Sequence, residues 1–279
     1  MIENLNVETI KNFIESENFL NNLNPYIRDF SENNIKGDFK QYKNNSLEDI
    51  LESKPKDEII KIFSAAVSLA YDDAKRRFSG IGKIWITPNC RDNFFIHIAT
   101  MIEKIFREPQ NNFNDWHKTT CVNLNEYLRE LGYNDTTYGK AQKIINMTFK
   151  YLYCLDTTNY CEKTFKKCHI PLDSFTLEWC RRYLKDKPKA LNSDTSWSGM
   201  EYELYNSLQT KIKEQLDYPL YVEFIIWPEI QKHIAAEEFI FSFKSYTTKE
   251  KKAFKNKKLS EKFHEISNIL EAEKSINRS

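Results

Sequence analysis

Apolar residues recur at intervals of three and four over most of the chain, and this period constrains the fold more than any other feature. Residues 59–70 and 94–105 each carry one such apolar stripe, as amphipathic helices do. An alternating pattern typical of strands is limited to residues 84–87. The sequence therefore predicts an all-α protein. Further helices are expected over residues 113–131, 140–155, 174–186, 199–216, 220–240 and 258–274.

The segments between these expected helices are short, and the chain shows no internal repeat of roughly 20 to 50 residues, which argues against a solenoid. A chain of 279 residues is long enough to bury a substantial core. We therefore expect a single compact helical domain over residues 1–279, with two lobes at roughly 1–130 and 131–279.

Composition excludes several classes of protein. No stretch approaches the roughly 18 consecutive apolar residues that a membrane helix needs, so we expect no contact with a membrane. The first residues, MIENLNVETI, are acidic and polar, and do not resemble a signal peptide. The six cysteines are irregularly spaced, which favours reduced thiols in a cytoplasm. Because Cys154, Cys161 and Cys168 lie seven residues apart, wider than the usual zinc-binding pairs, no metal or other cofactor is expected.

The net charge of +1 hides an uneven distribution. Residues 140–189 and 240–262 carry an excess of Lys and Arg, whereas residues 1–60 carry an excess of acids. Such local excess can steer a polyanion toward the protein, although solvated lysine-rich faces produce the same pattern. The lysine run at 244–262 is interpreted either as a basic tail for the DNA backbone or as an ordinary exposed helix.

The stretch YGKAQKIINMTFKYLY predicts a helix with one broad apolar face. Gly139, Lys143, Asn146 and Lys150 share a narrow arc on the other side. We therefore expect a polar, basic stripe that an anion could reach, with Gly139 near the helix N-terminus allowing a phosphate to approach the backbone.

A second helix is expected to begin after His169-Ile170-Pro171-Leu172-Asp173. Asp173 occupies the position of an N-cap, behind a proline that restricts the approach of the chain. A capping carboxylate accepts backbone N–H bonds, which favour its charged form and fix its orientation. Asp173 is thus predicted to be either a structural cap or a fixed anion beside a positively lined groove.

A glycine, then Gln142-Lys143 opening a helix, then a loop that delivers Ile-Pro-Leu-Asp resembles the catalytic core of the helix-hairpin-helix DNA glycosylases. The Gln-Lys opening looks most like the archaeal 8-oxoguanine branch. The polar and aromatic helix also resembles bacterial phage-defence glycosylases that excise glucosylated hydroxymethylcytosine. The resemblance covers residues 131–180. It implies two helical lobes with a cleft between them, and double-stranded DNA with a modified base as the partner.

Two features depart from the family pattern. Gly132 and Gly139 are seven residues apart, so the hairpin must be longer or altered. Thirty residues separate Lys143 from Asp173, more than the common arrangement in the family, and residues 156–168 are interpreted as an insertion.

The resemblance makes Asp173 and Lys143 the candidate catalytic residues. Breaking an N-glycosidic bond develops positive charge on the sugar, which an ionised Asp173 would stabilise. Lys143 would either attack C1′ and form a Schiff base, or remain protonated and hold phosphate or orient the base. The base must first leave the stack, and Trp116, Trp197 and Trp227 are candidates to stack on it, behind Trp179. The candidate DNA- or base-binding residues are Gly139, Lys140, Gln142, Asn146, His169 and Trp179.

Two other functions remain open. Arg91 and His97 match the Arg-polar-x4-His pattern of HEPN ribonucleases, which are also all-α and need both side chains on one helix face. The other alternative is a nucleic-acid-binding component of a defence complex with no chemistry of its own. The preferred hypothesis is a DNA glycosylase that excises a bulky glucosylated hydroxymethylcytosine of phage DNA, or otherwise an oxidised purine.

Overall fold

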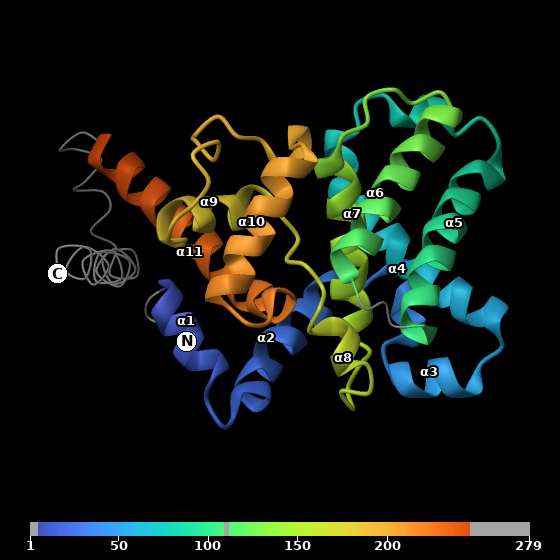
Figure 1. The fold of residues 1–279 in the computed structure, drawn as a ribbon, viewed down its shortest axis with the longest axis horizontal. Coiled ribbons are helices and arrows are strands. Elements are labelled where there is room, and N and C mark those ends of the chain that lie inside the picture. Colours follow the sequence, from blue (N-terminus) through green and yellow to red (C-terminus); the bar gives the residue numbers. More distant parts are fainter. Residues whose placement is uncertain (1–4, 109–111, 246–279) are drawn as a thin grey trace.

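A computed structural model describes residues 5–108 and 112–245, and these ranges contain helices and no strands, which confirms the all-α class. Figure 1 shows the helices in order along the chain. The α-helices are α1 (Val7–Ile14), α2 (Phe19–Asn34), α3 (Leu47–Ser53), α4 (Lys56–Ala74), α5 (Pro88–Arg107), α6 (Phe113–Glu130), α7 (Tyr138–Tyr153), α8 (Glu162–Phe165), α9 (Ser174–Tyr183), α10 (Tyr202–Gln215) and α11 (Pro219–Ser245). Short 3₁₀ helices are η1 (Gly37–Tyr42), η2 (Lys75–Arg77), η3 (Ile81–Ile84) and η4 (Trp197–Gly199).

The expected helices between residues 59 and 240 are present, with boundaries that differ by a few residues. The alternating pattern at residues 84–87 does not form a strand. Ile84 ends η3, and Thr87 is the N-cap of α5, whose first residue is Pro88. A proline at the first position favours the start of a helix over a strand. The helix expected at 258–274 lies outside the described residues. So does the lysine run at 244–262, apart from the last backbone residues of α11.

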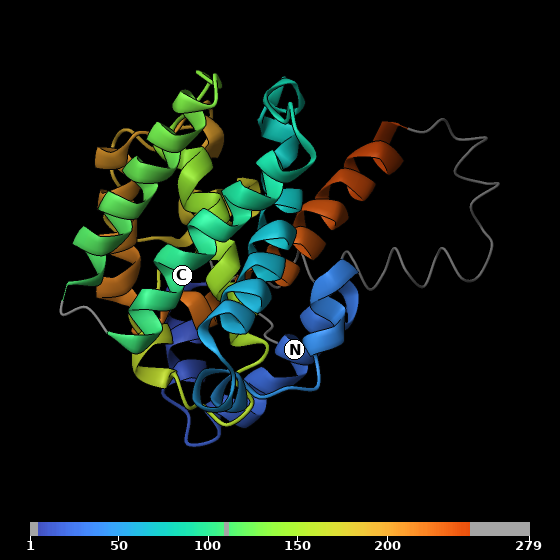
Figure 2. The same cartoon turned by 90° about the vertical axis from the view of Figure 1, so that its right-hand side faces the viewer.

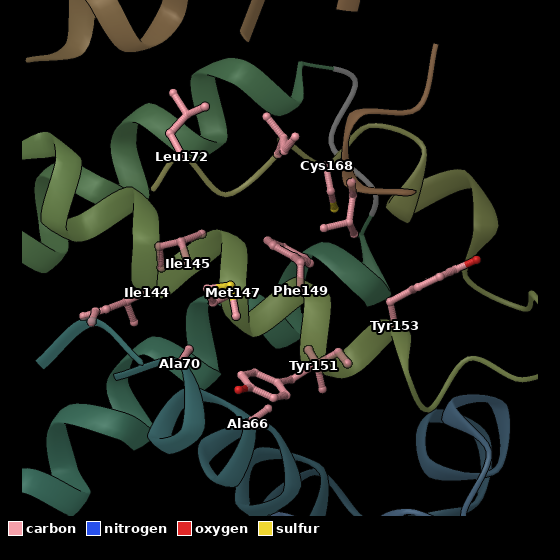
Figure 3. Close-up of a cluster of buried hydrophobic side chains, with 14 of the residues drawn as sticks. Ala66, Ala70, Ile144, Ile145, Met147, Phe149, Tyr151, Tyr153, Cys168 and Leu172 are labelled. Carbon is pink, nitrogen blue, oxygen red and sulfur yellow. The ribbon is translucent and has the colours of Figure 1, made fainter. Parts of the chain in front are cut away.

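Helix α7 lies at the centre of the fold, between α4 and α6 on one side and α10 on the other (Figure 1). All sixteen of its residues are buried. Figure 3 shows apolar side chains leaving this helix in several directions among neighbouring helices, Ile144, Ile145, Phe149 and Tyr153 among them. The expectation of an accessible polar stripe on α7 is therefore wrong. A helical wheel separates polar from apolar positions, but it does not tell a solvated face from a face whose polar groups have buried partners.

The start of α7 is fixed by its neighbours. Thr137 caps the helix, because its hydroxyl oxygen accepts the Lys140 N–H at 3.1 Å. The turn that joins α6 to α7 contains Gly132 at φ 91°, a conformation that favours glycine. At Gly139 a Cβ atom would lie 1.8 Å from the Trp197 carbonyl oxygen, so only glycine allows η4 to pack this closely. The same residue donates its N–H to the Met200 carbonyl at 2.8 Å.

Helix α11 packs against α9 and α2 and completes the surroundings of α7 on that side. Its N-terminal part is almost entirely buried, as expected for a helix whose apolar residues occur all round. Its C-terminal end extends away from the other helices in both views (Figure 2).

Candidate functional site

Asp173 is the N-cap of α9, as the sequence predicts. Its Oδ1 accepts the backbone N–H groups of Phe175 and Thr176, each at 3.0 Å. The Thr176 hydroxyl oxygen in turn accepts the Asp173 N–H at 2.7 Å, which completes a capping box. One carboxylate oxygen is thus held by the helix, and the carboxylate plane is fixed.

The other oxygen of Asp173 faces two side chains from distant helices. Lys143 Nζ of α7 lies 2.8 Å from Oδ2, and the indole N–H of Trp227 in α11 donates to the same oxygen at 3.1 Å. Asp173 and Lys143 are both buried. The two residues expected to carry the chemistry are therefore in direct contact, although thirty positions separate them in the sequence.

Both members of this pair are held in their charged forms. Burial alone would raise the pKa of the Asp173 carboxyl, but the charge and hydrogen bond of Lys143 outweigh it and lower that pKa. Burial alone would lower the pKa of Lys143, yet the negative charges of Asp173 and Glu223 raise it. The contact is consequently an ammonium–carboxylate pair rather than a neutral amine beside an acid.

A second buried ion pair lies two turns further along α7. Lys150 pairs with Glu223 of α11, and both side chains are almost completely inaccessible. The Lys150 Nζ also lies 3.9 Å from the centre of the Phe30 ring and 5.7 Å from that of Trp227. Aromatic rings therefore share this cation with its carboxylate. Burial raises the pKa of Glu223, and the charge of Lys150 opposes that shift.

Both pairs line one cavity of about 700 Å³. Its wall is built from residues of α2, the end of α4, α7, the start of α9, η4 and α11. The charged groups are therefore not a sealed core network, because they border space large enough for a small molecule. The apolar part of the wall consists of Phe30, Met147, Phe175, Trp197 and Trp227.

The end of α4 supplies a further carboxylate to the same cavity. Asp73 accepts the hydroxyl proton of Tyr151 at 2.8 Å. Burial raises the pKa of Asp73, and the Tyr151 hydrogen bond partly offsets that rise. The neighbouring Arg76 and Arg77 of η2 are exposed and also line the cavity, so they add two cations to a wall whose buried part holds both lysines and carboxylates.

Two of the expected DNA-binding residues serve the fold around the start of α7. The expectation of a close phosphate approach at Gly139 is wrong, because the backbone of Trp197 already occupies that space. Lys140 is buried and pairs with Asp135, donating to its carbonyl at 2.8 Å and contacting its carboxylate at 2.6 Å. Lys140 thus braces the turn between α6 and α7 rather than facing the cavity.

Three others lie behind the cavity in a buried polar network. Asn146 accepts the Nε2–H of His117 at 2.9 Å and donates to the Tyr205 hydroxyl at 2.9 Å. Tyr205 donates to Nδ1 of His169 at 2.8 Å, and His169 donates to Asn114 at 2.8 Å. Both histidines are neutral in this arrangement, since burial lowers the pKa of His117 to about 4 and lowers that of His169 well below its usual value. Gln142 belongs to the same side of α7, where it contacts Leu172.

The expectation that Trp179 stacks on a base is wrong. Its ring is fully buried, and its indole N–H donates to the Leu5 carbonyl at 2.7 Å. Trp197 and Trp227 line the cavity instead. Position in sequence near Asp173 was a poor guide, because one helical turn of α9 already carries Trp179 into the core.

Arg91 and His97, the alternative ribonuclease pair, face different neighbours on α5. Arg91 is exposed and lies 5.9 Å from the Phe95 ring centre. The His97 ring stacks on Tyr127 of α6 at 4.5 Å, and burial lowers its pKa. The structure therefore does not bring the two side chains together.

The three regularly spaced cysteines are free and buried. Within residues 5–108 and 112–245, no group of three His, Cys, Asp or Glu side chains is arranged to hold a metal ion. In the same ranges, no helix is both long enough and apolar enough to cross a bilayer.

Sequence reasoning missed Glu223, Asp73 and Phe30 and did not favour Trp227. Glu223 is an isolated acid inside the apolar run YVEFIIW, and a carboxylate in such a run signals a buried partner. Asp73 and Phe30 carry no comparable signal, because only the packing of α2 and α4 against α7 brings them to the cavity. A scan of protein-family models finds no match to the chain, and searches of curated proteins and of solved structures find none either.

Proposed function

We propose that the protein is a DNA glycosylase that flips a modified base out of duplex DNA and excises it, leaving an abasic site. The observation that carries this proposal is a buried, charged and oriented Asp173 in contact with Lys143 at the edge of an aromatic-walled cavity. A fixed anion of this kind stabilises the positive charge that develops on the sugar as the glycosidic bond breaks. The bond's electron pair leaves with the base, water adds at C1′, and the proton of the water ends on the departing base.

Helix α7 provides a length scale for the base. Lys143 and Lys150 are seven residues apart, or about 10 Å along the helix axis, with Met147 between them. The indole of Trp227 covers the same interval, since its N–H reaches Asp173 while its ring lies 5.7 Å from Lys150. We place the sugar near Asp173 and the base against Trp227. The far edge of the base then meets the Lys150–Glu223 pair, which offers one donor and one acceptor.

The cavity volume favours a bulky base. About 700 Å³ falls well inside the range of pockets that enclose small-molecule ligands, and exceeds what one flat base fills. Arg76, Arg77 and Asp73 provide hydrogen-bond donors and acceptors along the part of the cavity that a flat base would leave empty. We therefore propose glucosylated hydroxymethylcytosine of phage DNA as the first substrate to test, with a role in anti-phage defence, and an oxidised purine as the second. The sugar hydroxyls would meet this polar wall.

The turn between α6 and α7 stands where the resemblance places the hairpin. Its Gly132 is exposed at positive φ, whereas Gly139 is buried. We propose that this altered hairpin, and not the start of α7, contacts the DNA backbone. The helices on either side of the cavity would then act as the two lobes of the family fold, with the cavity as the cleft between them.

Lys143 has two possible roles, which one experiment separates. As an ammonium it holds Asp173 and a nearby phosphate, and the enzyme releases the base by hydrolysis alone. If its proton passes to Oδ2 of Asp173, 2.8 Å away, the free amine can attack C1′ and expel the base, which leaves with the electron pair of the glycosidic bond. Opening of the sugar ring then gives a Schiff base, and β-elimination from it releases the 3′ phosphate and cleaves the strand. Borohydride traps only the second route, as a covalent protein–DNA product.

The test incubates the protein with unmodified DNA, with DNA containing 8-oxoguanine, and with phage DNA containing glucosylated hydroxymethylcytosine. Released bases are identified by mass spectrometry, and abasic sites by alkaline cleavage. Asp173→Asn should slow base release by at least 10²- to 10³-fold, because asparagine keeps the cap and removes the charge. Its affinity for DNA should change little.

Asp156→Asn is the matched control. Asp156 is also a buried carboxylate that accepts a backbone N–H, from Cys161, but it does not line the cavity. This variant should release bases as the unaltered protein does. Failure of the unaltered protein to release a base from all three DNAs, under conditions where it binds them, would overturn the proposal.

A further inference from the structure

The segment that delivers Asp173 has no regular secondary structure. All residues from 168 to 173, between α8 and α9, are buried. Every backbone N–H and C=O in such a segment needs a partner, because water does not reach it. The partners chosen here therefore decide where Asp173 lies.

Two glutamine side chains serve as those partners, in the same way. The Gln209 amide of α10 donates to the Ile170 carbonyl at 2.8 Å and accepts the Ile170 N–H at 3.2 Å. The Gln142 amide of α7 donates to the Leu172 carbonyl at 2.8 Å and accepts the Leu172 N–H at 3.2 Å. Each glutamine thus forms the paired hydrogen bonds that a neighbouring strand would form. Between them stands Pro171, which has no N–H, and whose carbonyl accepts the Thr176 hydroxyl at 2.9 Å.

The Gln142 pairing fixes the distance across the candidate site. Gln142 and Lys143 are adjacent on α7, and they bind Leu172 and Asp173, which are adjacent in the segment. A shift of the segment along α7 would therefore have to break the Gln142 pair as well as the Lys143–Asp173 contact. The Gln142 oxygen also accepts the Asn146 amide at 3.0 Å, which ties its orientation to the buried network behind the cavity.

We propose that Gln142 and Gln209 are positioning residues that hold the 168–173 segment in register and so place the Asp173 carboxylate against Lys143. The catalytic part of this inference rests on the proposed glycosylase function, whereas the placement of the carboxylate does not. A displacement of about 1 Å at a reacting group costs on the order of 10²-fold in rate. The two glutamines therefore act on the chemistry without touching the cavity.

The chain contains a matched control for this chemistry. Gln215 forms the same pair of bonds with Lys185 at the other end of α9, donating to its carbonyl at 2.7 Å and accepting its N–H at 3.0 Å. This pair is exposed and does not line the cavity. Substituting methionine, which is close to glutamine in size, removes the paired bonds in each of the three cases, and Gln142→Met also removes the bond from the Asn146 amide.

The first readout requires no enzymatic activity. Lysines carrying a ¹³C label at Cε report the titration of Lys143 by NMR, with Lys143→Gln used to assign the signal. The negative charge of Asp173 helps to raise the pKa of Lys143. Gln142→Met and Gln209→Met should therefore lower the titration midpoint of Lys143, and Gln215→Met should leave it unchanged. The second readout is single-turnover base release: the first two variants should lower the rate constant about 10- to 100-fold, with the Kd for DNA unchanged.

Gln209→Asn provides a graded, uncharged variant in case a methionine variant does not fold. It keeps the amide on a side chain one methylene shorter, which weakens both bonds to Ile170, so its midpoint and rate should fall between those of the unaltered protein and Gln209→Met. An unchanged Lys143 midpoint in both Gln142→Met and Gln209→Met would overturn the inference. So would an equal effect of Gln215→Met, since that would indicate general destabilisation. If no DNA yields a base but the midpoints shift as expected, the proposed function fails and the placement of Asp173 by the glutamines stands.

Discussion

Two neighbouring faces of α7 are buried and polar, yet they are built on different principles. One face carries Lys143 and Lys150, whose carboxylate partners come from α9 and α11 and border the cavity. The other carries Gln142 and Asn146, which bind neutral groups. On the first face, the opposite charges of Lys143 and Asp173 keep each other ionised. On the second, burial keeps the histidines neutral.

The two faces also differ in how completely their polar groups are paired. In the network, donors and acceptors alternate without interruption from His117 through Asn146 and Tyr205 to His169. Such a satisfied network holds its members in one geometry and leaves no group for a ligand. On the cavity face, Glu223 accepts no hydrogen bond from the residues that the structure describes beyond its ion pair with Lys150. The charges border open space, and the neutral network packs on the adjacent face of α7; in the proposed function the charges would contact the ligand and the network would fix their positions.

The largest predicted effect on stability comes from breaking the second ion pair. Lys150→Met leaves the Glu223 carboxylate buried among apolar groups without its counter-ion, which should lower the free energy of unfolding by about 3–5 kcal/mol. The double variant Lys150→Met, Glu223→Met removes both charges and should recover most of that loss. Urea unfolding followed by circular dichroism measures both. If the double variant is as unstable as Lys150→Met, the Lys150–Glu223 pair itself stabilises the fold, and this prediction is wrong.

How far the sequence predicts these two faces depends on the range of the contacts. The helices follow from local apolar spacing, and the Asp173 cap follows from the residues beside it, so both were predictable. Lys143 was predicted only through the resemblance. The prediction of an accessible stripe was wrong for a different reason. The helical wheel shows that Lys143, Asn146 and Lys150 share an arc, but it does not show that helices distant in the sequence supply buried partners for them.

Helix α11 illustrates the same limit. Its apolar residues predict a buried helix, but they occur all round it. The sequence therefore does not indicate that the face with Glu223 and Trp227 is the one that lines the cavity. The polar network is also invisible in sequence. Its histidines and asparagines are scattered over α6, α7 and the 168–173 segment, its Tyr205 lies in α10, and only the packed fold brings them together.

The neutral face should respond to pH in a window of its own. Burial lowers the pKa of His117 from about 6.5 to about 4, so the unfolded chain binds a proton more readily than the folded one. The stabilisation is complete above pH 6.5 and is lost as the pH falls toward 4, by about 3 kcal/mol in all. His169 contributes in the same direction. The carboxyl of Asp173, whose pKa is lowered from 3.8, loses its contribution only at still lower pH.

Urea unfolding between pH 7.5 and pH 4 measures this dependence. His117→Gln is less stable at neutral pH but should show a smaller loss on acidification, because it lacks the titrating group. The difference between the two curves isolates His117 from other groups that titrate in the range. Parallel curves would show that His117 has the same pKa in the folded and the unfolded chain, and the contrast between a neutral face and a charged face would fail.

The smallest predicted effects concern two indoles, one buried in the core and one that lines the cavity beside the charged face. Trp179→Phe removes one buried hydrogen bond to the Leu5 carbonyl and should cost about 1 kcal/mol of stability, with base release unchanged. Trp227→Phe keeps an aromatic wall but removes the donor to Asp173, and should slow base release about tenfold with little change in stability. Thermal unfolding and single-turnover kinetics on both variants give four values. We expect Trp179→Phe to lower mainly the stability and Trp227→Phe to lower mainly the rate of base release. Because both side chains are indoles, only this difference in effect distinguishes a ring with a structural role from a ring that faces a ligand.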